Sequence, residues 1–353
     1  MIDLRNLQSE REASVNIAEV ARVTGVSTAT VSRALSGRGS VSPTTREKVL
    51  TAASELGYVV SQAASTLASG RNRNVGIVVP FLEKWFFVEV LAGAQERLNR
   101  AGYDVTLYNL NLDGHGDERR EVFENFLLRR RVDAVIAVSL ELTDGEIARL
   151  HALDKPLVGV GGPITGVRTL ALDDVRAARL ATEHLLGLGH TRIAHIGGDD
   201  ASDVDFHLPT KRRQGYEEAL RAARVTPDPA LLTTADFTLP GGYQAAKQLL
   251  GAPVGQRPTA IFATSDEMAI GAILAARDLG LVVPRDLSVI GVDDHDLASF
   301  FGLTTIAQSP RHQGALAAES LLAELEPDVH PPIDTVLPFE LIVRDSTSRP
   351  LVD

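Results

Sequence analysis

The chain has 353 residues, 44% hydrophobic and 23% charged, which predicts several globular domains rather than a disordered or fibrous protein. The absence of cysteine excludes disulfides, cysteine metal sites and cysteine nucleophiles, and no apolar run approaches the roughly 18 to 20 residues that span a bilayer. Residues 1–14 are polar and charged, so we expect a flexible N-terminal tail rather than a signal peptide, and a cytoplasmic protein with no membrane partner.

The net charge of −11 is unevenly distributed along the chain. Between Val15 and Arg73 there are seven basic and three acidic residues, a net charge of +4, so the remainder is strongly acidic. A basic segment joined to an acidic body concentrates the affinity for phosphate in one module. This distribution is typical of a DNA-binding domain attached to a second domain.

The stretch VNIAEVARVTGVSTATVSRAL, residues 15–35, predicts a helix-turn-helix. Apolar residues recur at helical spacing on both sides of a turn at Gly25, and Ser27 is placed to cap the second helix. In that motif the start of the second helix enters the major groove. Two small helices also occur in ordinary protein cores, so the pattern alone leaves that alternative open. The residues expected at the DNA are Ser27, Thr28, Ala29, Thr30, Ser32 and Arg33.

A third helix should run from Pro43 to Leu56 and end at Gly57, which completes a DNA-binding domain over residues 15–57. Residues 58–74 are alanine-rich and then pass into a Gly/Arg/Asn segment. We interpret them as a hinge that becomes helical only when a partner chain or DNA holds it, because short helices are marginal in isolation.

From Val75 the pattern changes to apolar strands alternating with helices. Buried strands that end at Gly and Asp, with helices between them, predict doubly wound parallel sheets. The roughly 270 residues involved exceed the usual size of one sheet, so we expect two α/β subdomains. The helices expected here are Val88–Arg100, 118–130, Ala177–Gly187, Arg212–Ala223 and Met268–Leu279.

Many segments in one order resemble the lactose-repressor (LacI/GalR) family of transcription regulators. They include IAEVARVTGVSTATVSRAL, QAASTLASGR, LGHTRIAHIGG, PTAIFATSDEMAIGAILAARDLG and LSVIGVDD, and the resemblance covers residues 15–347. It implies a body like a periplasmic sugar-binding protein, with the chain crossing between subdomains near Leu172, Leu303 and Pro332. The N-subdomain would comprise residues 75–172 and 304–332, and the C-subdomain residues 173–303 and 333–347.

The resemblance also implies roles for single residues. Thr28 and Ala29 would read base edges, and Leu67 of the hinge would wedge into the minor groove at the operator centre. Carboxylates and guanidinium groups suit polyols, and aromatic faces pack on sugar rings. The effector-binding residues carried over in this way are Trp85, Phe86, Arg212, Phe237, Ser265 and Asp293.

Each of these assignments has a structural alternative. Arg212 would otherwise be a surface ion pair, Asp293 a strand-end cap, and the aromatic residues part of the core. Lys84 and Trp85 stand where relatives have Asn-Pro, and Ser265 replaces a common asparagine, so the effector cannot be copied from a familiar member of the family.

Together these features predict an effector-controlled repressor that binds a pseudo-palindromic operator in double-stranded DNA as a homodimer or a dimer of dimers. A sugar or sugar derivative is the expected effector, acting either as an inducer or as a co-repressor. A solute-binding protein of sugar transport and a sugar-metabolising enzyme are the alternatives. We expect no cofactor, metal or catalysis, because phosphate-loop, nucleophile-elbow and HExxH motifs are absent, and the acidic loop from Asp199 to Asp205 lacks the spacing of a calcium loop.

Overall fold

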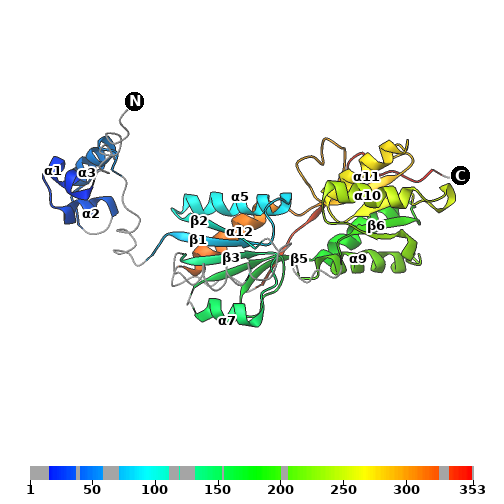
Figure 1. Cartoon of the computed structure of the whole chain (residues 1–353), viewed down its shortest axis with the longest axis horizontal. Coiled ribbons are helices and arrows are strands. Elements are labelled where there is room, and N and C mark those ends of the chain that lie inside the picture. The colour runs from blue at the N-terminus through cyan, green and yellow to red at the C-terminus, as the bar shows by residue number, and fades with distance from the viewer. Residues whose placement is uncertain are drawn as a thin grey trace, which may run out of the picture. The chain divides into compact units, whose positions relative to one another are not determined.

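The computed structural model describes residues 16–36, 40–58, 71–110, 119, 132–152, 155–199, 206–325 and 334–351. The chain divides into two units, Met1–Arg73 and Asn74–Asp353, which we call the head and the body (Figure 1). The predicted tail, most of the hinge with Leu67, and the expected helix 118–130 apart from residue 119 lie outside the described residues. No described helix is both long enough and apolar enough to cross a membrane.

The head is a bundle of α1 (Ile17–Thr24), α2 (Thr28–Ser36) and α3 (Pro43–Glu55). Asn16 caps α1 by accepting a hydrogen bond from the Glu19 amide at 3.1 Å, and Gly25 ends this helix with φ 69°, a conformation that costs glycine little. The three helices enclose a thin core whose buried members are Val20, Ala21, Val31, Ala34, Val49 and Ala53.

The first sheet of the body has the strand order β11-β5-β4-β3-β1-β2, and all its strands are parallel. Helices α5 and α12 pack on one of its faces and α7 on the other (Figure 1). The elements are β1 (Asn74–Val79), α5 (Trp85–Arg100), β2 (Asp104–Asn109), β3 (Ala134–Val138), α7 (Asp144–Ala152), β4 (Leu157–Val160), β5 (Arg168–Leu172), α12 (Pro310–Glu324) and β11 (Asp334–Leu337).

The second sheet has the order β12-β10-β9-β8-β6-β7, in which only the β10–β12 pair is antiparallel. Helices α10 and α11 pack on one face, and α8 and α9 on the other. The elements are α8 (Asp174–Gly187), β6 (Ile193–Gly197), α9 (Leu208–Ala222), η4 (Pro229–Leu231), β7 (Leu232–Thr234), α10 (Leu239–Leu250), η5 (Val254–Gln256), β8 (Ala260–Ala263), α11 (Asp266–Asp278), β9 (Ser288–Asp293), β10 (Thr304–Ala307) and β12 (Glu340–Ile342).

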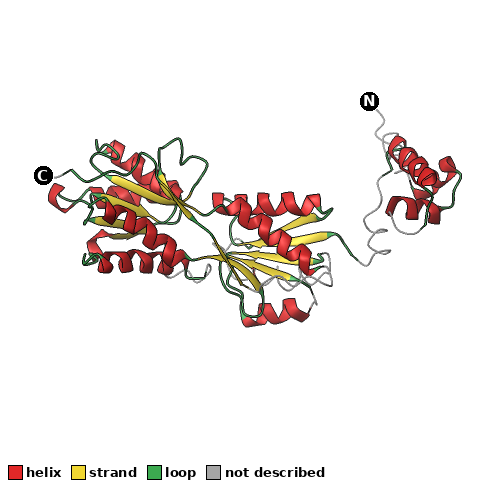
Figure 2. Cartoon of the chain, turned by 180° about the vertical axis from the view of Figure 1, so that it is seen from behind, coloured by secondary structure: helices red, strands yellow, loops and turns green. Residues whose placement is uncertain are grey.

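The chain passes between the sheets three times: after β5, after β10 and after β11 (Figure 2). The first passage follows Leu172, but the boundaries predicted near Leu303 and Pro332 are wrong. Strand β10 pairs with β9 in the second sheet, and β11 pairs with β5 in the first. The apolar sequences of β10 and β11 indicate strands but not which sheet each strand joins. Both boundaries between the subdomains therefore were predicted several residues too early.

Candidate functional sites

The start of α2 presents a polar, exposed surface on the head. Thr28, Ala29, Ser32 and Arg33 are exposed, whereas Val31 and Ala34 on the opposite side are buried in the head core. This alternation follows from the helical period, since the buried and exposed residues lie on opposite sides of one helix. The predicted DNA-facing residues therefore share one accessible face.

Two of the predicted DNA-binding residues also hold the helix start in place. Ser27 Oγ accepts a hydrogen bond from the Thr30 amide at 3.2 Å and lies 2.9 Å from Thr30 Oγ1. This arrangement satisfies one of the amide groups that the first helical turn leaves without a partner. It fixes the position from which Thr28 and Ala29 project.

The body contains a cavity of about 370 Å³ at the carboxyl ends of its parallel strands, where the two subdomains meet. Phe86, Arg212, Phe237, Ser265 and Asp293, five of the six predicted effector-binding residues, line it. Residues with no predicted role also line this cavity, which we call the cleft; among them are Phe81, Lys84, Asp174, Glu267, Gln308 and Gln313.

Arg212 is fixed in the cleft wall by a buried ion pair. Its Nε donates to Asp174 Oδ1 at 2.9 Å, both side chains are about 5% exposed, and Nη1 donates to the carbonyl of Thr264. The pair joins the starts of α8 and α9. A guanidinium that donates to two acceptors at a buried position keeps its planar set of donors in one orientation.

Asp293 ends β9 with its carboxylate at the cleft, in a backbone conformation of φ 130°, and Asp294 follows at φ 57°. Such positive φ values cost energy in non-glycine residues and occur where a side chain must be aimed. Gln308 Nε2 donates to Asp293 Oδ1, and Gln313 Nε2 donates to the Gln308 carbonyl at 2.8 Å. Burial raises the pKa of Asp293, while Arg212 opposes that rise.

The start of α11 contributes three polar residues to this region. Ser265 caps the helix by accepting from the Met268 amide at 3.3 Å. Asp266 is fully buried and accepts from Thr305 Oγ1 at 2.7 Å and from the His295 amide at 2.9 Å. Burial, followed by the nearby Asp293 charge, raises the pKa of Asp266 well above its ordinary value. Glu267 faces the cleft.

One ammonium group, together with aromatic rings, forms contacts between the two subdomains across the cleft. Lys84 Nζ, from the first subdomain, donates to the Asp236 carbonyl of the second at 3.0 Å. The same ammonium lies 4.5 Å from the centroid of the Phe81 ring and 5.6 Å from that of Phe237. The sequence marked Lys84 as a departure from the family pattern, but nothing in it placed this residue at the cleft.

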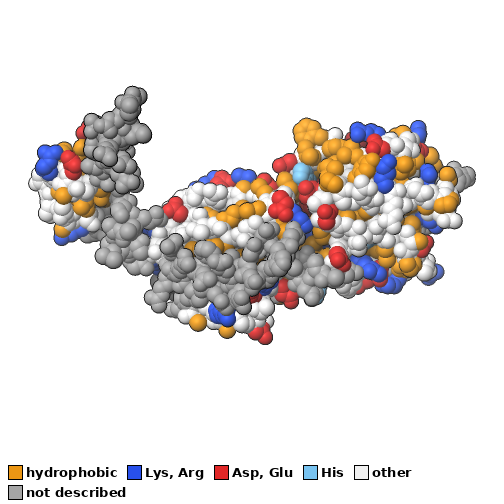
Figure 3. Space-filling view, viewed as in Figure 1, with side chains coloured by type: hydrophobic (Ala, Val, Ile, Leu, Met, Phe, Trp, Pro, Cys, Tyr) orange, Lys and Arg blue, Asp and Glu red, His pale blue; other side chains and the backbone are white. Residues whose placement is uncertain are grey.

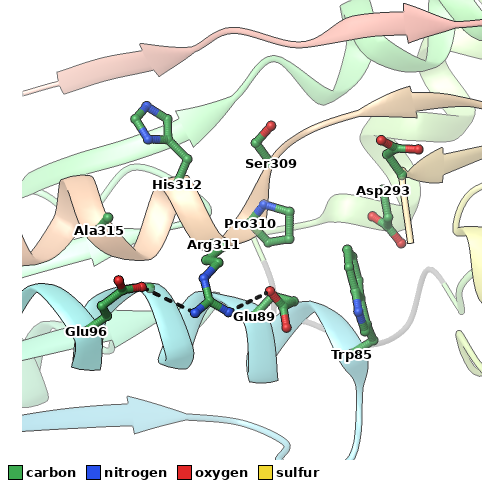
Figure 4. Close-up of a pocket in the computed structure, with 11 residues that line it drawn as sticks. Trp85, Glu89, Glu96, Asp293, Ser309, Pro310, Arg311, His312 and Ala315 are labelled. Carbon is green, nitrogen blue, oxygen red and sulfur yellow. Dashed lines mark hydrogen bonds and ion pairs between the residues drawn. The ribbon is translucent and has the colours of Figure 1, made fainter. Parts of the chain in front are cut away.

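Trp85, the sixth predicted effector-binding residue, is not among the residues that line the cleft. Trp85 begins α5 and lines a neighbouring cavity of about 490 Å³ together with Glu89, Arg311 and Asp293, the residue that this cavity shares with the cleft (Figure 4). Its ring lies 4.7 Å from that of His295, and its Nε1 donates to Asp296 at 3.3 Å. Consecutive helical residues point about 100° apart, so Trp85 and Phe86 do not share one side of the helix.

No group of three or more His, Cys, Asp or Glu side chains in the described part of the chain could hold a metal ion. His190 is instead used in hydrogen bonds to Thr259 at 2.9 Å and to Ser288 at 3.0 Å. Among the predicted acidic-loop residues, Asp199 alone is described, and it lines the cleft.

Two family models match the chain. Residues 16–61 match "Bacterial regulatory proteins, lacI family", and residues 182–347 match "Periplasmic binding protein-like domain". The HTH-type transcriptional repressor CytR of Escherichia coli K12 is 34% identical over 96% of this chain and 98% of its own length. The HTH-type transcriptional regulator DegA of Bacillus subtilis is 33% identical over 94% of this chain and 98% of its own length. These relatives are named as regulators, not as enzymes.

Solved structures agree with this result. A lac repressor dimer bound to operator and the anti-inducer ONPF has a TM-score of 0.81 and 28% identity, covering 95% of this chain and 99% of that one. The transcriptional regulator CelR in complex with cellobiose has a TM-score of 0.68 and 32% identity, covering 94% of this chain and 99% of that one.

Proposed function

Because the chain belongs to the lacI family of bacterial regulatory proteins, we propose that it is a cytoplasmic repressor whose binding to an operator is controlled by an effector in the cleft. One observation carries the proposal. The same chain combines an exposed helix-turn-helix face with a cavity lined by both subdomains of a periplasmic-binding-protein-like body. The head is the feature that separates this function from solute transport or catalysis.

At the operator, Thr28 and Ala29 face base edges and Arg33 lies at the same exposed surface. Ala29 has no hydrogen-bonding side-chain group, so its contact is limited to a thymine methyl group. Ser27 and Thr30 contribute by holding the start of α2. Leu67, which lies outside the described residues, is assigned to the minor groove on the family resemblance alone.

The protein acts as a homodimer, or as a dimer of dimers, whose two-fold axis matches that of a pseudo-palindromic operator. The lac repressor structure contains a dimer on its operator. This body also exposes apolar side chains in the loop after β9, where Phe300 is 83% and Leu297 42% exposed. Figure 3 shows hydrophobic side chains gathered at the upper edge of the body, as expected of a surface that a second copy covers.

The effector contacts Arg212, Asp293, Phe86, Phe237 and Ser265 in the cleft. Sugars suit this site, since a carboxylate accepts from neighbouring hydroxyls and a guanidinium donates to others. CelR was solved with cellobiose, and a LacI-family regulator from Enterococcus faecium with ribose. A ligand between two subdomains shifts their closure by its different affinity for the two states, typically with about 1 to 3 kcal/mol of coupling.

The test is selection of bound sequences from random duplex DNA by the purified protein, repeated with a panel of sugars and nucleobases. We expect a palindrome whose enrichment is lost with one compound, which makes that compound an inducer. Enrichment only in the presence of a compound would establish a co-repressed regulator instead. The proposal fails if no sequence is enriched under any condition.

A further inference from the structure

The cleft contains more carboxylates than cations. Five acidic and two basic side chains line it. One of the two cations, Arg212, is paired with Asp174, and the other, Lys84, donates to a backbone carbonyl. Within the described structure, neither Glu267 nor Asp293 forms an ion pair. The carboxyl groups on the side of the cleft formed by β9 and α11 therefore have no ion-pair partner in contact with them among the described residues.

Glu267 is the least satisfied of these acids. It is half-buried at the start of α11 and faces the cavity. Asp266 beside it accepts two hydrogen bonds, and Asp293 accepts one from Gln308, whereas Glu267 has no hydrogen-bond partner among the described residues. A first-turn acid is favoured by the helix dipole, which explains a negative charge at this position. The dipole does not explain why this carboxylate faces the cavity with no hydrogen-bond donor of the described chain in contact with it.

The cavity wall already accommodates an ammonium group. The Lys84 Nζ lies over the faces of Phe81 and Phe237, at 4.5 Å and 5.6 Å from the ring centroids. Aromatic faces attract cations through their quadrupole, most strongly where water is excluded. Phe86 adds a third ring to the same cavity. A cavity wall that combines aromatic rings with carboxylates selects a ligand that is positively charged and partly apolar.

We propose that the effector carries a protonated amino group, which lies between Glu267 and Asp293 while its ring packs on Phe86 and Phe237. The proposal rests on the proposed function, which makes this cleft the effector site. Amino sugars are the class that fits best, because their hydroxyls also match Arg212 and Gln308. A neutral sugar would leave the Glu267 carboxyl group without an ion-pair partner.

The affinity for such an amine should depend on pH. The charged groups around Glu267 are Asp293 from β9, Asp236 from the segment before α10 and Lys84 from the segment before α5, with Arg212, Asp174 and Asp199 elsewhere in the wall. Burial, followed by Asp293, raises the pKa of Glu267 to about 7. Below that pH an ammonium must displace a proton, so its affinity should rise with pH, by at most about tenfold per unit. A neutral sugar releases no such proton.

Titration calorimetry on the full chain tests the proposal with matched pairs: D-glucosamine and D-glucose, D-galactosamine and D-galactose, D-mannosamine and D-mannose. Benzylamine and benzyl alcohol form a pair without sugar stereochemistry. We expect the charged member to bind at least about tenfold more tightly in the benzyl pair and in one sugar pair, as a charge-assisted hydrogen bond provides. Glu267→Gln should abolish the preference, whereas Glu218→Gln should leave it unchanged, because Glu218 is a half-buried acid on α9 that does not line the cleft.

Three results would overturn the proposal: equal or tighter binding of the neutral members, a preference that survives in Glu267→Gln, or no binding of any amine at millimolar concentration. Operator binding is measured on the same samples. If operator binding is intact without an amine preference, only this inference fails. If the protein binds no operator, the proposed function itself fails.

Discussion

The cost in folding stability of a buried charge in this body depends on the residue that is paired with it. The buried pair of Arg212 and Asp174 illustrates this, because removing one member leaves the other without compensation. Effector contact and stability are therefore coupled at this position. A variant of Arg212 must be examined for both properties.

We expect Arg212→Ala to abolish the response to effector while leaving operator binding intact, because the head and the body are separate units. The substitution should also cost about 3 to 5 kcal/mol of stability by leaving Asp174 buried and unpaired. Operator binding with and without effector, together with urea unfolding, measures both effects. Arg221→Ala, on the exposed side of the same helix, is the control. Loss of operator binding by a folded Arg212→Ala protein would contradict the assignment.

His195 predicts how stability responds to acid. Its ring packs 5.0 Å from Tyr216 and 5.6 Å from Phe262, and its buried Nε2 has no partner among the described residues. Burial lowers the pKa of His195 to about 3 from the ordinary 6.5. The unfolded chain therefore binds a proton between these values that the folded chain does not, so stability falls as pH falls below about 6.5.

His195→Phe should remove this part of the acid sensitivity. The expected result is a smaller decrease in the unfolding free energy of the variant between pH 7 and pH 5, measured by urea unfolding at each pH. His312→Phe, at an exposed position, should change nothing. Parallel pH curves for wild-type protein and His195→Phe would show that the histidine is not buried uncharged.

Helices α5 and α12 form the layer that supports the cleft, and their contact depends on glycine. A Cβ added at Gly314 would lie 1.9 Å from the Val90 carbonyl, and one at Gly93 would lie 1.9 Å from the Arg311 carbonyl. The two helices thus approach each other backbone to backbone. No side chain fits at either position unless the helices separate.

Gly314→Ala should therefore destabilise the body by about 1 to 3 kcal/mol, the usual cost of overpacking. Gly187→Ala is the matched control, since Gly187 is also helical and has no atom within 4 Å of an added Cβ. That substitution should stabilise by about 0.5 to 1 kcal/mol through helix propensity. Thermal or urea unfolding distinguishes the two, and a neutral Gly314→Ala would exclude the close packing of α5 on α12.

The hinge element has its own prediction. If Leu67 wedges into the minor groove, Leu67→Ala should weaken specific operator binding much more than non-specific binding, because phosphate contacts remain. The comparison requires operator and scrambled duplex at the same salt concentration. Equal losses on both would indicate that Leu67 only packs the hinge.

The sequence predicted the helices and strands better than it predicted which side chains meet in the folded protein. Alternating apolar strands and helices were enough for the α/β body, and the helical period was enough for the exposed face of α2. Helices α5, α8, α9 and α11 begin two to four residues earlier than predicted, because caps such as Ser265 lie outside the apolar pattern. Lys84 and Glu267 reach the cleft only through tertiary packing, which leaves no periodic signal in the sequence.

At the scale of the whole body, regulation requires two subdomains that can close on one another. Three short passages of the chain connect them, and some side chains also reach from one subdomain to the other. Lys84 is one of these, since it reaches from the first subdomain to Asp236 and Phe237 in the second. A contact of this kind exists in one arrangement of the subdomains and is lost when they separate. It therefore biases the equilibrium that an effector also shifts.

Lys84→Ala should favour the open form of the ligand-free protein. A partly exposed cation–π contact contributes about 0.5 to 1 kcal/mol, which corresponds to a roughly two- to fivefold change in the ratio of closed to open molecules. The measurement is the distribution of distances between spin labels placed one on each subdomain. Lys247→Ala is the control, because that ammonium lies 5.4 Å from the Tyr243 ring within the same helix and bridges nothing. Identical distance distributions for the two variants would mean that Lys84 packs at the cleft without influencing its closure.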